Sequence, residues 1–207
     1  MPRAGLTPAV VVAEAARLAD EVGLDRLTLA ALAQRLGVAL PSLYKHVRGL
    51  DAVLQKLSAL ATAELAAELV VAAAGRSRGD AVRATAEAWR AYARRHPGRY
   101  QAAQRVPDPD DPEHVAAGER AVQTAYAVLR GYGLAGDDVV DATRAFRSAL
   151  HGFVLLENGG AFGLPVDVDR SFQQLVAALE VALRNWPTAE AAERTGRVRR
   201  SAAPIPR

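Results

Sequence analysis

The stretch of sequence that decides the fold is residues 28–47, TLAALAQRLGVALPSLYKHV. It holds two short helical patterns separated by Gly37, and the second pattern begins near Pro41. Thr28 is a suitable N-cap before apolar residues at i, i+3, i+4 and i+7, and glycine accepts the positive φ of a helix C-cap. The pattern therefore predicts two helices joined by a tight turn. This arrangement is typical of a helix-turn-helix, which places the end of a helix in the DNA major groove.

The second helical pattern predicts one apolar and one polar face. Leu43 and Val47 lie four residues apart and are expected to face the core. The side chains on the outer side can donate hydrogen bonds to phosphate oxygens or base edges, and they are Ser42, Tyr44, Lys45 and His46. Between Arg26 and Leu50 the chain has four basic residues and no Asp or Glu. A polyanion would meet no repulsion from this stretch.

The segment before this stretch adds a third helical pattern. Residues 7–23, TPAVVVAEAARLADEVG, offer Thr7 as an N-cap, Pro8 at the first helical position and Gly23 as the stop. With LDRLTLAALAQRLGV and PSLYKHV, the order and spacing resemble the N-terminal DNA-binding domain of TetR-type transcriptional regulators. The alternative from spacing and charge alone is an ordinary helical hairpin of a solvated all-α domain, and the resemblance favours DNA binding over it.

The resemblance implies which residues face DNA. They are Thr28, Ala39, Leu40, Pro41, Ser42, Tyr44, Lys45, His46 and Arg48. The three apolar members of this set stand where the family often has polar side chains, so they can touch a thymine methyl but cannot form bidentate hydrogen bonds. Sequence readout then rests on the tyrosine, the lysine and DNA shape. Leu50 occupies the position of the family's phosphate-clamping lysine, and Arg48 is a candidate to replace that lysine.

Composition and length fit a small cytoplasmic protein. The chain has 207 residues, half of them hydrophobic, and a formal net charge of +3. It has no cysteine, which excludes disulfides and thiolate metal sites and agrees with a reducing compartment. The sequence shows neither a secretory signal pattern nor an apolar run near the roughly 20 residues of a spanning helix. We therefore expect no membrane contact.

Beyond residue 50 the pattern stays helical. We expect further helices over about 51–74, 80–96, 97–105, 114–132, 137–158 and 169–186. Asp51 and Asp80 are candidate N-caps of the first two. The acidic segment 107–113 has three prolines and no glycine, so we interpret it as a connector rather than a calcium loop. The sequence thus predicts an all-α protein of about nine helices. Its parts are a helix-turn-helix domain over 1–50, a ligand-binding and dimerisation domain over 51–187 and a flexible basic tail over 188–207.

The last two helical patterns are candidates for a dimer interface. Each carries an apolar stripe with helical spacing. A core within one subunit is the plain alternative and accounts for at least half of these residues. The resemblance implies a four-helix bundle formed by two C-terminal helices of each subunit. On that basis the predicted interface residues are Phe146, Leu150, His151, Phe153, Phe172, Leu175, Leu179 and Leu183.

His151 and Gly152 also match the His-Gly pair of the TetR subgroup named for a Trp-His-Gly signature, although no tryptophan immediately precedes them. For His151 we favour a packed or hydrogen-bonded interface residue over a catalytic base, because no nucleophile accompanies it. The sequence has no metal motif, nucleophile elbow or phosphate loop. We therefore predict no enzyme activity, no metal and no cofactor.

The resemblance further implies a homodimer that binds a palindromic DNA operator and a small-molecule effector that releases it. Aromatic residues expected near the effector, each of which also fits an ordinary core position, are Trp89, Tyr92, Tyr100, Tyr126, Phe146 and Phe153. The leading interpretation is a ligand-responsive repressor, with activation left open. The alternatives are an all-α small-molecule enzyme and a protein-interaction adaptor, each with a helix-turn-helix-like head.

Overall fold

The computed structural model describes residues 6–187, and within that range it contains nine α-helices, one short 3-10 helix and no strand. The elements are α1 (Pro8–Val22), η1 (Leu24–Arg26), α2 (Leu29–Leu36), α3 (Leu40–Leu43), α4 (Leu50–Ala73), α5 (Arg78–Arg95), α6 (Pro97–Ala102), α7 (Pro112–Arg130), α8 (Gly136–Asn158) and α9 (Val168–Arg184). The predicted all-α fold is confirmed. The predicted basic tail, 188–207, lies outside the described residues.

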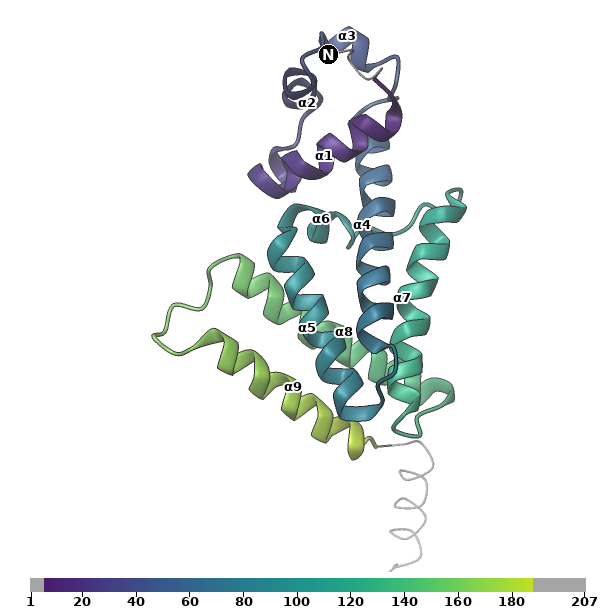
Figure 1. Ribbon diagram of the computed structural model, residues 1–207, viewed down its shortest axis with the longest axis vertical. Coiled ribbons are helices and arrows are strands. Elements are labelled where there is room, and N and C mark those ends of the chain that lie inside the picture. Colours follow the sequence, from purple (N-terminus) through teal and green to yellow (C-terminus); the bar gives the residue numbers. More distant parts are fainter. Residues whose placement is uncertain (1–5, 188–207) are drawn as a thin grey trace, which may run out of the picture.

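The molecule has a head made of α1–α3 and a body made of α5–α9, with α4 running from one into the other (Figure 1). The head core includes buried residues of α1–α3 together with Val53 and Leu57 of α4, so it extends past the predicted boundary at residue 50. Each buried Val or Leu contributes on the order of 2 kcal/mol relative to exposure. Because α4 is continuous, it fixes the position of the head on the body.

The helix ends of the head follow from local side-chain chemistry. The Thr7 hydroxyl accepts a hydrogen bond from the Val10 amide at 3.3 Å, and the Thr28 hydroxyl accepts one from the Ala31 amide at 3.1 Å. Gly37 has φ of +67°, the left-handed conformation that a non-glycine residue rarely adopts. These three predicted helix ends are confirmed, and they define the angle between α2 and α3.

Several predicted helix ends in the body were wrong. Gly49 and Ser77 occupy the N-cap positions of α4 and α5, so Asp51 and Asp80 lie in the first turns instead. A carboxylate in the first turn also interacts favourably with the helix dipole, so an aspartate near a helix start is easily taken for the N-cap residue. Helix α6 ends at Ala102 rather than at residue 105. In the head, α3 ends at Leu43 and continues as a hydrogen-bonded turn through residue 46.

Candidate nucleic-acid interface and internal cavity

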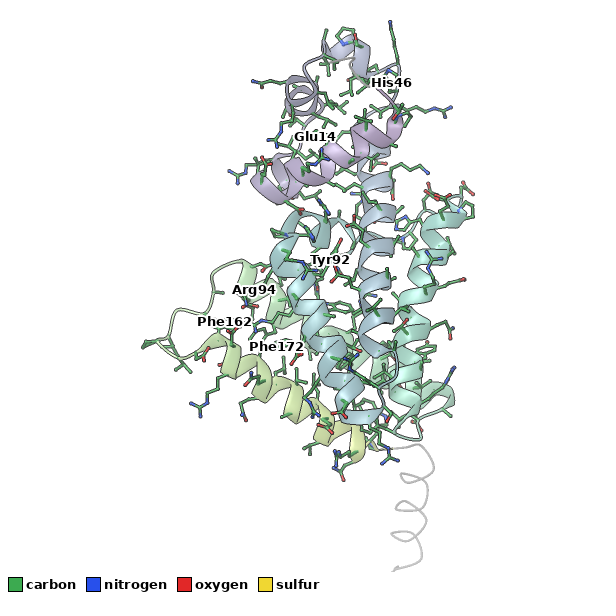
Figure 2. The ribbon with its side chains drawn as sticks, viewed as in Figure 1. Glu14, His46, Tyr92, Arg94, Phe162 and Phe172 are labelled. Atoms are coloured by element: carbon green, nitrogen blue, oxygen red, sulfur yellow. The ribbon has the colours of Figure 1, made fainter. Side chains whose placement is uncertain are left out.

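The outer end of the head carries the residues predicted to face DNA. Six of the nine are exposed, namely Thr28, Ala39, Pro41, Tyr44, Lys45 and Arg48, and the other three, Leu40, Ser42 and His46, are half-buried. Tyr44 is 56% exposed, whereas Leu43 beside it is fully buried and anchors α3 in the head core. Figure 2 shows His46 at the end of the molecule that α3 occupies, far from α9. The structure therefore brings the nine residues to one end and seals none of them inside.

The basic charge of this end is smaller than the sequence suggests. The guanidinium of Arg35 donates to Glu14 at 2.8 Å and to Glu21 at 2.5 Å, and both carboxylates come from α1. The hydrogen bond from Arg35 also lowers the pKa of Glu21. A stretch that is free of acids in sequence thus has acids beside it in space. In the described part of the chain, Lys45 and Arg48 form no ion pair and remain available for phosphate oxygens.

The body holds a partly open cavity of about 460 Å³ between α4, α5, α7 and α8, with residues 103–107 at one side. Two of the six predicted aromatic residues line it, Trp89 and Phe146. The others lie elsewhere. The Tyr92 hydroxyl lies within hydrogen-bond distance of the Ala61 carbonyl and the Glu64 carboxylate, and Tyr100 lies beside Trp89. Tyr126 packs against the body core, and Phe153 contacts Phe162 and Phe172. Aromatic type alone does not identify which side of a helix meets a cavity.

Polar residues of the cavity wall were missed by sequence reasoning. They are Thr62, Thr85, Gln104, Arg105, Glu119, Gln123, Thr143 and Arg147. Thr85 lies four residues before Trp89 and therefore shares its face of α5, so helical spacing could have found it. The residues after α6 have no such signal, because an irregular segment has no periodic face.

A hydrogen-bond chain runs behind the cavity wall. The Trp89 indole N–H donates to the Tyr100 hydroxyl at 2.9 Å, and that hydroxyl lies 2.8 Å from Nδ1 of His151. Since an indole can only donate, the Tyr100 hydroxyl accepts from it, and the tautomer of His151 decides whether that hydroxyl donates to Nδ1 or accepts from it. Burial lowers the pKa of His151 and raises that of Tyr100 to about 12, so both stay neutral near pH 7. His151 is thus hydrogen-bonded within its own subunit.

The predicted interface residues need a correction. Four of the eight, Phe146, Leu150, Phe172 and Leu183, are buried in the core of one subunit and offer no surface to a second copy. The other four, His151, Phe153, Leu175 and Leu179, are half-buried. An apolar stripe predicts that a face is covered, but not by which partner. The apolar side chains that α8 and α9 do expose are Leu155, Leu156 and Val181.

Arg90 holds the α8–α9 pair against α5. Its guanidinium donates to Glu157 at 2.8 and 2.5 Å and to Asp169 at 2.6 Å, and it lies 4.7 Å from the centroid of the Phe172 ring. Figure 2 shows Phe172 of α9 beside α5, with Arg94 of α5 nearby. The Arg90 contacts join the end of α8 to the start of α9, so they fix the hairpin that carries the exposed apolar residues.

Two functional classes find no support in residues 6–187. Over that range no cluster of three or more acidic or histidine side chains is arranged to hold a metal ion. The helices within the same range are also too short or too polar to cross a membrane.

The helix-turn-helix head on an all-α body defines the class of this protein as a helix-turn-helix transcriptional regulator. Residues 11–57 match the family described as bacterial regulatory proteins, tetR family, and residues 82–179 match the Tetracyclin repressor-like C-terminal domain. The chain belongs to the TetR family of transcriptional regulators, which confirms the resemblance. Neither description names the Trp-His-Gly subgroup, and that assignment stays a prediction.

Relatives and solved structures agree with this assignment. The chain is 41% identical over 179 residues to an uncharacterized HTH-type transcriptional regulator of Mycobacterium tuberculosis, Rv0681, covering 86% of this chain and 82% of the relative. A second such regulator, YobS of Bacillus subtilis, is 32% identical over 81% of this chain and 87% of its own. A variant of TetR from Acinetobacter baumannii, in complex with minocycline, has the same fold with a TM-score of 0.69. The two sequences are 24% identical, and the match covers 89% of this chain and 100% of the TetR chain.

Proposed function

We propose that this protein is a repressor that binds a palindromic DNA operator as a homodimer and leaves it when a small molecule fills the internal cavity. The observation that carries the proposal is the presence, in one subunit, of an exposed α3 end and a partly open cavity connected through α6. In this proposal residues 1–50 bind DNA and residues 51–187 bind the effector and dimerise. A protein that acts on chromosomal DNA in this way works in the cytoplasm and catalyses no reaction.

We assign the DNA contacts by side-chain chemistry. Lys45 and Arg48 bind phosphates, and Arg48 takes the part of the family lysine that Leu50 replaces. Tyr44 reaches a base edge or phosphate, while Ala39 and Pro41 lie against thymine methyl groups. A two-fold dimer presents two α3 helices to successive major grooves about 34–36 Å apart, which requires a palindromic site.

We assign the dimer interface to the outer surface of α8 and α9. Leu155 and Leu156 at the end of α8 are 59% and 49% exposed, and Val181 near the end of α9 is 61% exposed, so both helices present large apolar side chains to solvent. A Cβ at Gly152 would meet nothing within 4 Å, so the α8 backbone is open to a partner helix there. The half-buried Leu175 and Leu179 complete the same helix pair.

Helix α6 supplies the connection between cavity and head. Its Tyr100 is hydrogen-bonded to Trp89 in the cavity wall, while the backbone amide of Arg99 donates to Asp20 of α1 at 2.9 Å. A ligand that displaces Trp89 therefore displaces α6 and, through it, α1. The ligand must prefer the displaced form, and a shift from 1:99 to 99:1 needs about 10⁴-fold preference.

The test is selection of bound fragments from genomic DNA with the full-length protein, followed by gel shift on the enriched sequence. We expect a palindrome whose half-sites lie one helical turn, or a multiple of it, apart. Tyr44→Ala and Lys45→Ala should lose affinity for it while remaining folded and dimeric. Absence of any enriched fragment, with no salt-dependent DNA binding, would contradict the proposal and favour a protein-interaction adaptor.

A further inference from the structure

We propose that the effector is an organic acid with an apolar body, whose carboxylate binds Arg147 at the side of the cavity formed by residues 103–107. This inference rests on the proposed role of the cavity as the effector site. It is carried by three features of the wall: its apolar surface, its buried donors without partners, and a guanidinium without a carboxylate.

The apolar surface of the wall comes from four helices, among them α7 with Val115 and Val122. Leu65 and Leu69 of α4, Trp89 of α5 and Phe146 of α8 all line the cavity, and three of these are nearly or fully buried. Filling such a surface removes apolar area of both partners from water, which is the main source of affinity for a small molecule in an apolar cavity. The body of the ligand is therefore aliphatic or aromatic.

The buried polar atoms of the wall that lack partners can all donate hydrogen bonds. The hydroxyls of Thr62 and Thr85 and Nε of Arg105 are buried and have no hydrogen-bond partner within the described residues. Thr85 is only 2% exposed. A guanidinium N–H can donate but never accept, and a hydroxyl can do both. The Arg105 N–H can be satisfied only by an acceptor, and an acceptor oxygen also satisfies either hydroxyl.

Charge distinguishes an acid from a neutral acceptor. Arg147 forms a hydrogen bond of 3.2 Å to Gln104, yet no carboxylate among residues 6–187 lies within 4 Å of it. Arg105, the residue after Gln104, is already paired with Asp51 at 2.7 Å. Glu119 of α7 also lines the cavity and is exposed, and it too lies beyond 4 Å from Arg147. Arg147 is therefore the guanidinium of the wall that a carboxylate can pair with.

The field of Arg147 acts on the groups behind the wall. Together with burial, it lowers the pKa of His151, and it opposes the rise that burial causes in the pKa of Tyr100. A carboxylate bound at Arg147 would offset this positive potential. It would also form charge-assisted hydrogen bonds, which are shorter and stronger than those of a neutral oxygen. The side of the cavity at Arg147 is therefore better matched to an anion than to an ester or an alcohol.

The experiment compares acids with their esters on the full-length protein. Decanoate and 2-naphthoate serve as an aliphatic and an aromatic probe, each paired with its methyl ester, and dissociation constants are measured by calorimetry. We expect at least one acid to bind about ten-fold or more tightly than its ester, because the ester cannot form the charge-assisted hydrogen bond. Arg147→Gln should abolish that preference by weakening the acid alone.

Arg144→Gln is the matched control, because Arg144 lies on the same helix and is exposed like Arg147, but it does not line the cavity and it pairs with Asp141. It should keep the preference for the acid. Circular dichroism verifies that both variants fold. The proposal is overturned if acid and ester bind equally, if Arg147→Gln keeps the preference, or if neither acid binds below about 1 mM.

Gel shift with the same ligands separates this proposal from the proposed repressor function. An ester that releases DNA as well as its acid does contradicts the acid preference and leaves the repressor intact. If an acid binds but leaves DNA binding unchanged, only the proposed release of DNA by the effector is contradicted.

Discussion

Gly98 of α6 lies directly against the carbonyl group of Ala19 in α1, so that a Cβ at residue 98 would be 2.1 Å from the Ala19 oxygen. Backbone meets backbone at this point, and the next residue of α1, Asp20, also accepts the Arg99 amide. The same carboxylate pairs with Nε of Arg99 at 3.0 Å. At Gly98 the head therefore meets the body backbone to backbone, where no flexible side chain can absorb a displacement.

Gly98→Ala should separate α6 from α1. Overpacking of this kind costs about 1–3 kcal/mol, and here it also shifts the head, so the free energy of unfolding and the operator affinity should both fall. Urea denaturation and gel shift measure the two effects. Gly118→Ala is the control, because its Cβ would meet only Pro107 at 3.8 Å. Equal behaviour of the two variants would show that the α6–α1 contact does not position the head.

Arg90→Met should destabilise the protein and loosen the packing of α8 and α9 against α5. The side chains of Arg90 and Glu157 are 10% and 15% exposed, and removing one partner of a buried pair costs about 3–5 kcal/mol because the other charge is left unpaired. Asp169→Asn should cost at most about 1 kcal/mol, since Asp169 is 65% exposed. Urea denaturation measures the free energy of unfolding of each variant, and analytical ultracentrifugation measures whether it still dimerises. A loss below about 1 kcal/mol for Arg90→Met would argue against this role.

Thr85→Val should stabilise the ligand-free protein by about 1 kcal/mol, because it removes a buried hydroxyl that has no partner among the described residues. Thr143→Val is the matched comparison in the same cavity, since the Thr143 hydroxyl donates to the Val139 carbonyl at 2.7 Å. That variant should gain nothing. Thermal or urea unfolding without ligand provides the measurement, and a destabilised Thr85→Val would mean that the hydroxyl is satisfied in solution.

Acid should destabilise the protein through His114. Its ring is fully buried between α7 and α4, with Nε2 3.2 Å from the Ser58 hydroxyl, and burial lowers its pKa although Asp111 opposes the shift. Below its ordinary value near 6.5 the unfolded chain then binds more protons than the folded one. The stability that neutral His114 contributes is therefore fully present above about pH 6.5, and it is lost as the pH falls toward the pKa of His114 in the folded protein.

His114→Gln should flatten this part of the pH dependence. Urea midpoints compared at about pH 7.5 and about pH 5.5 test it, with the wild type losing more stability on acidification than the variant. His151 has the same sign of shift, from burial and from Arg147, so a residual slope is expected in His114→Gln. An identical slope in both proteins would rule His114 out as its source.

Local chemistry determined what could be predicted from the sequence. The caps at Thr7 and Thr28 and the turn at Gly37 depend on neighbours within four residues, and all three are where the pattern places them. Contacts between distant residues have no such signal. Arg90 and Glu157 are 67 residues apart, and nothing in either helix indicates that they meet.

In the candidate site, too, local features could be predicted from the sequence and contacts between distant residues could not. The exposed end of α3 follows from helical spacing, because Leu43 fixes one face in the core and leaves Tyr44 and Lys45 outside. The pairing of Arg35 with the carboxylates of α1 required the packing of two helices. Four of the eight residues predicted for the interface on α8 and α9 belong instead to the subunit's own core, because an apolar stripe does not show what covers it.

The most direct test of the central claim is the salt dependence of operator affinity for wild type, Tyr44→Ala, Lys45→Ala and Arg76→Ala. Arg76 is exposed beyond the far end of α4, where its guanidinium donates to the Ala72 carbonyl. We predict that Lys45→Ala weakens binding and lowers the slope of log K against log salt by about one for each phosphate that the protein no longer binds. Tyr44→Ala should weaken binding at every salt concentration, and Arg76→Ala should match wild type. Unchanged affinity and slope in both head variants would contradict the account.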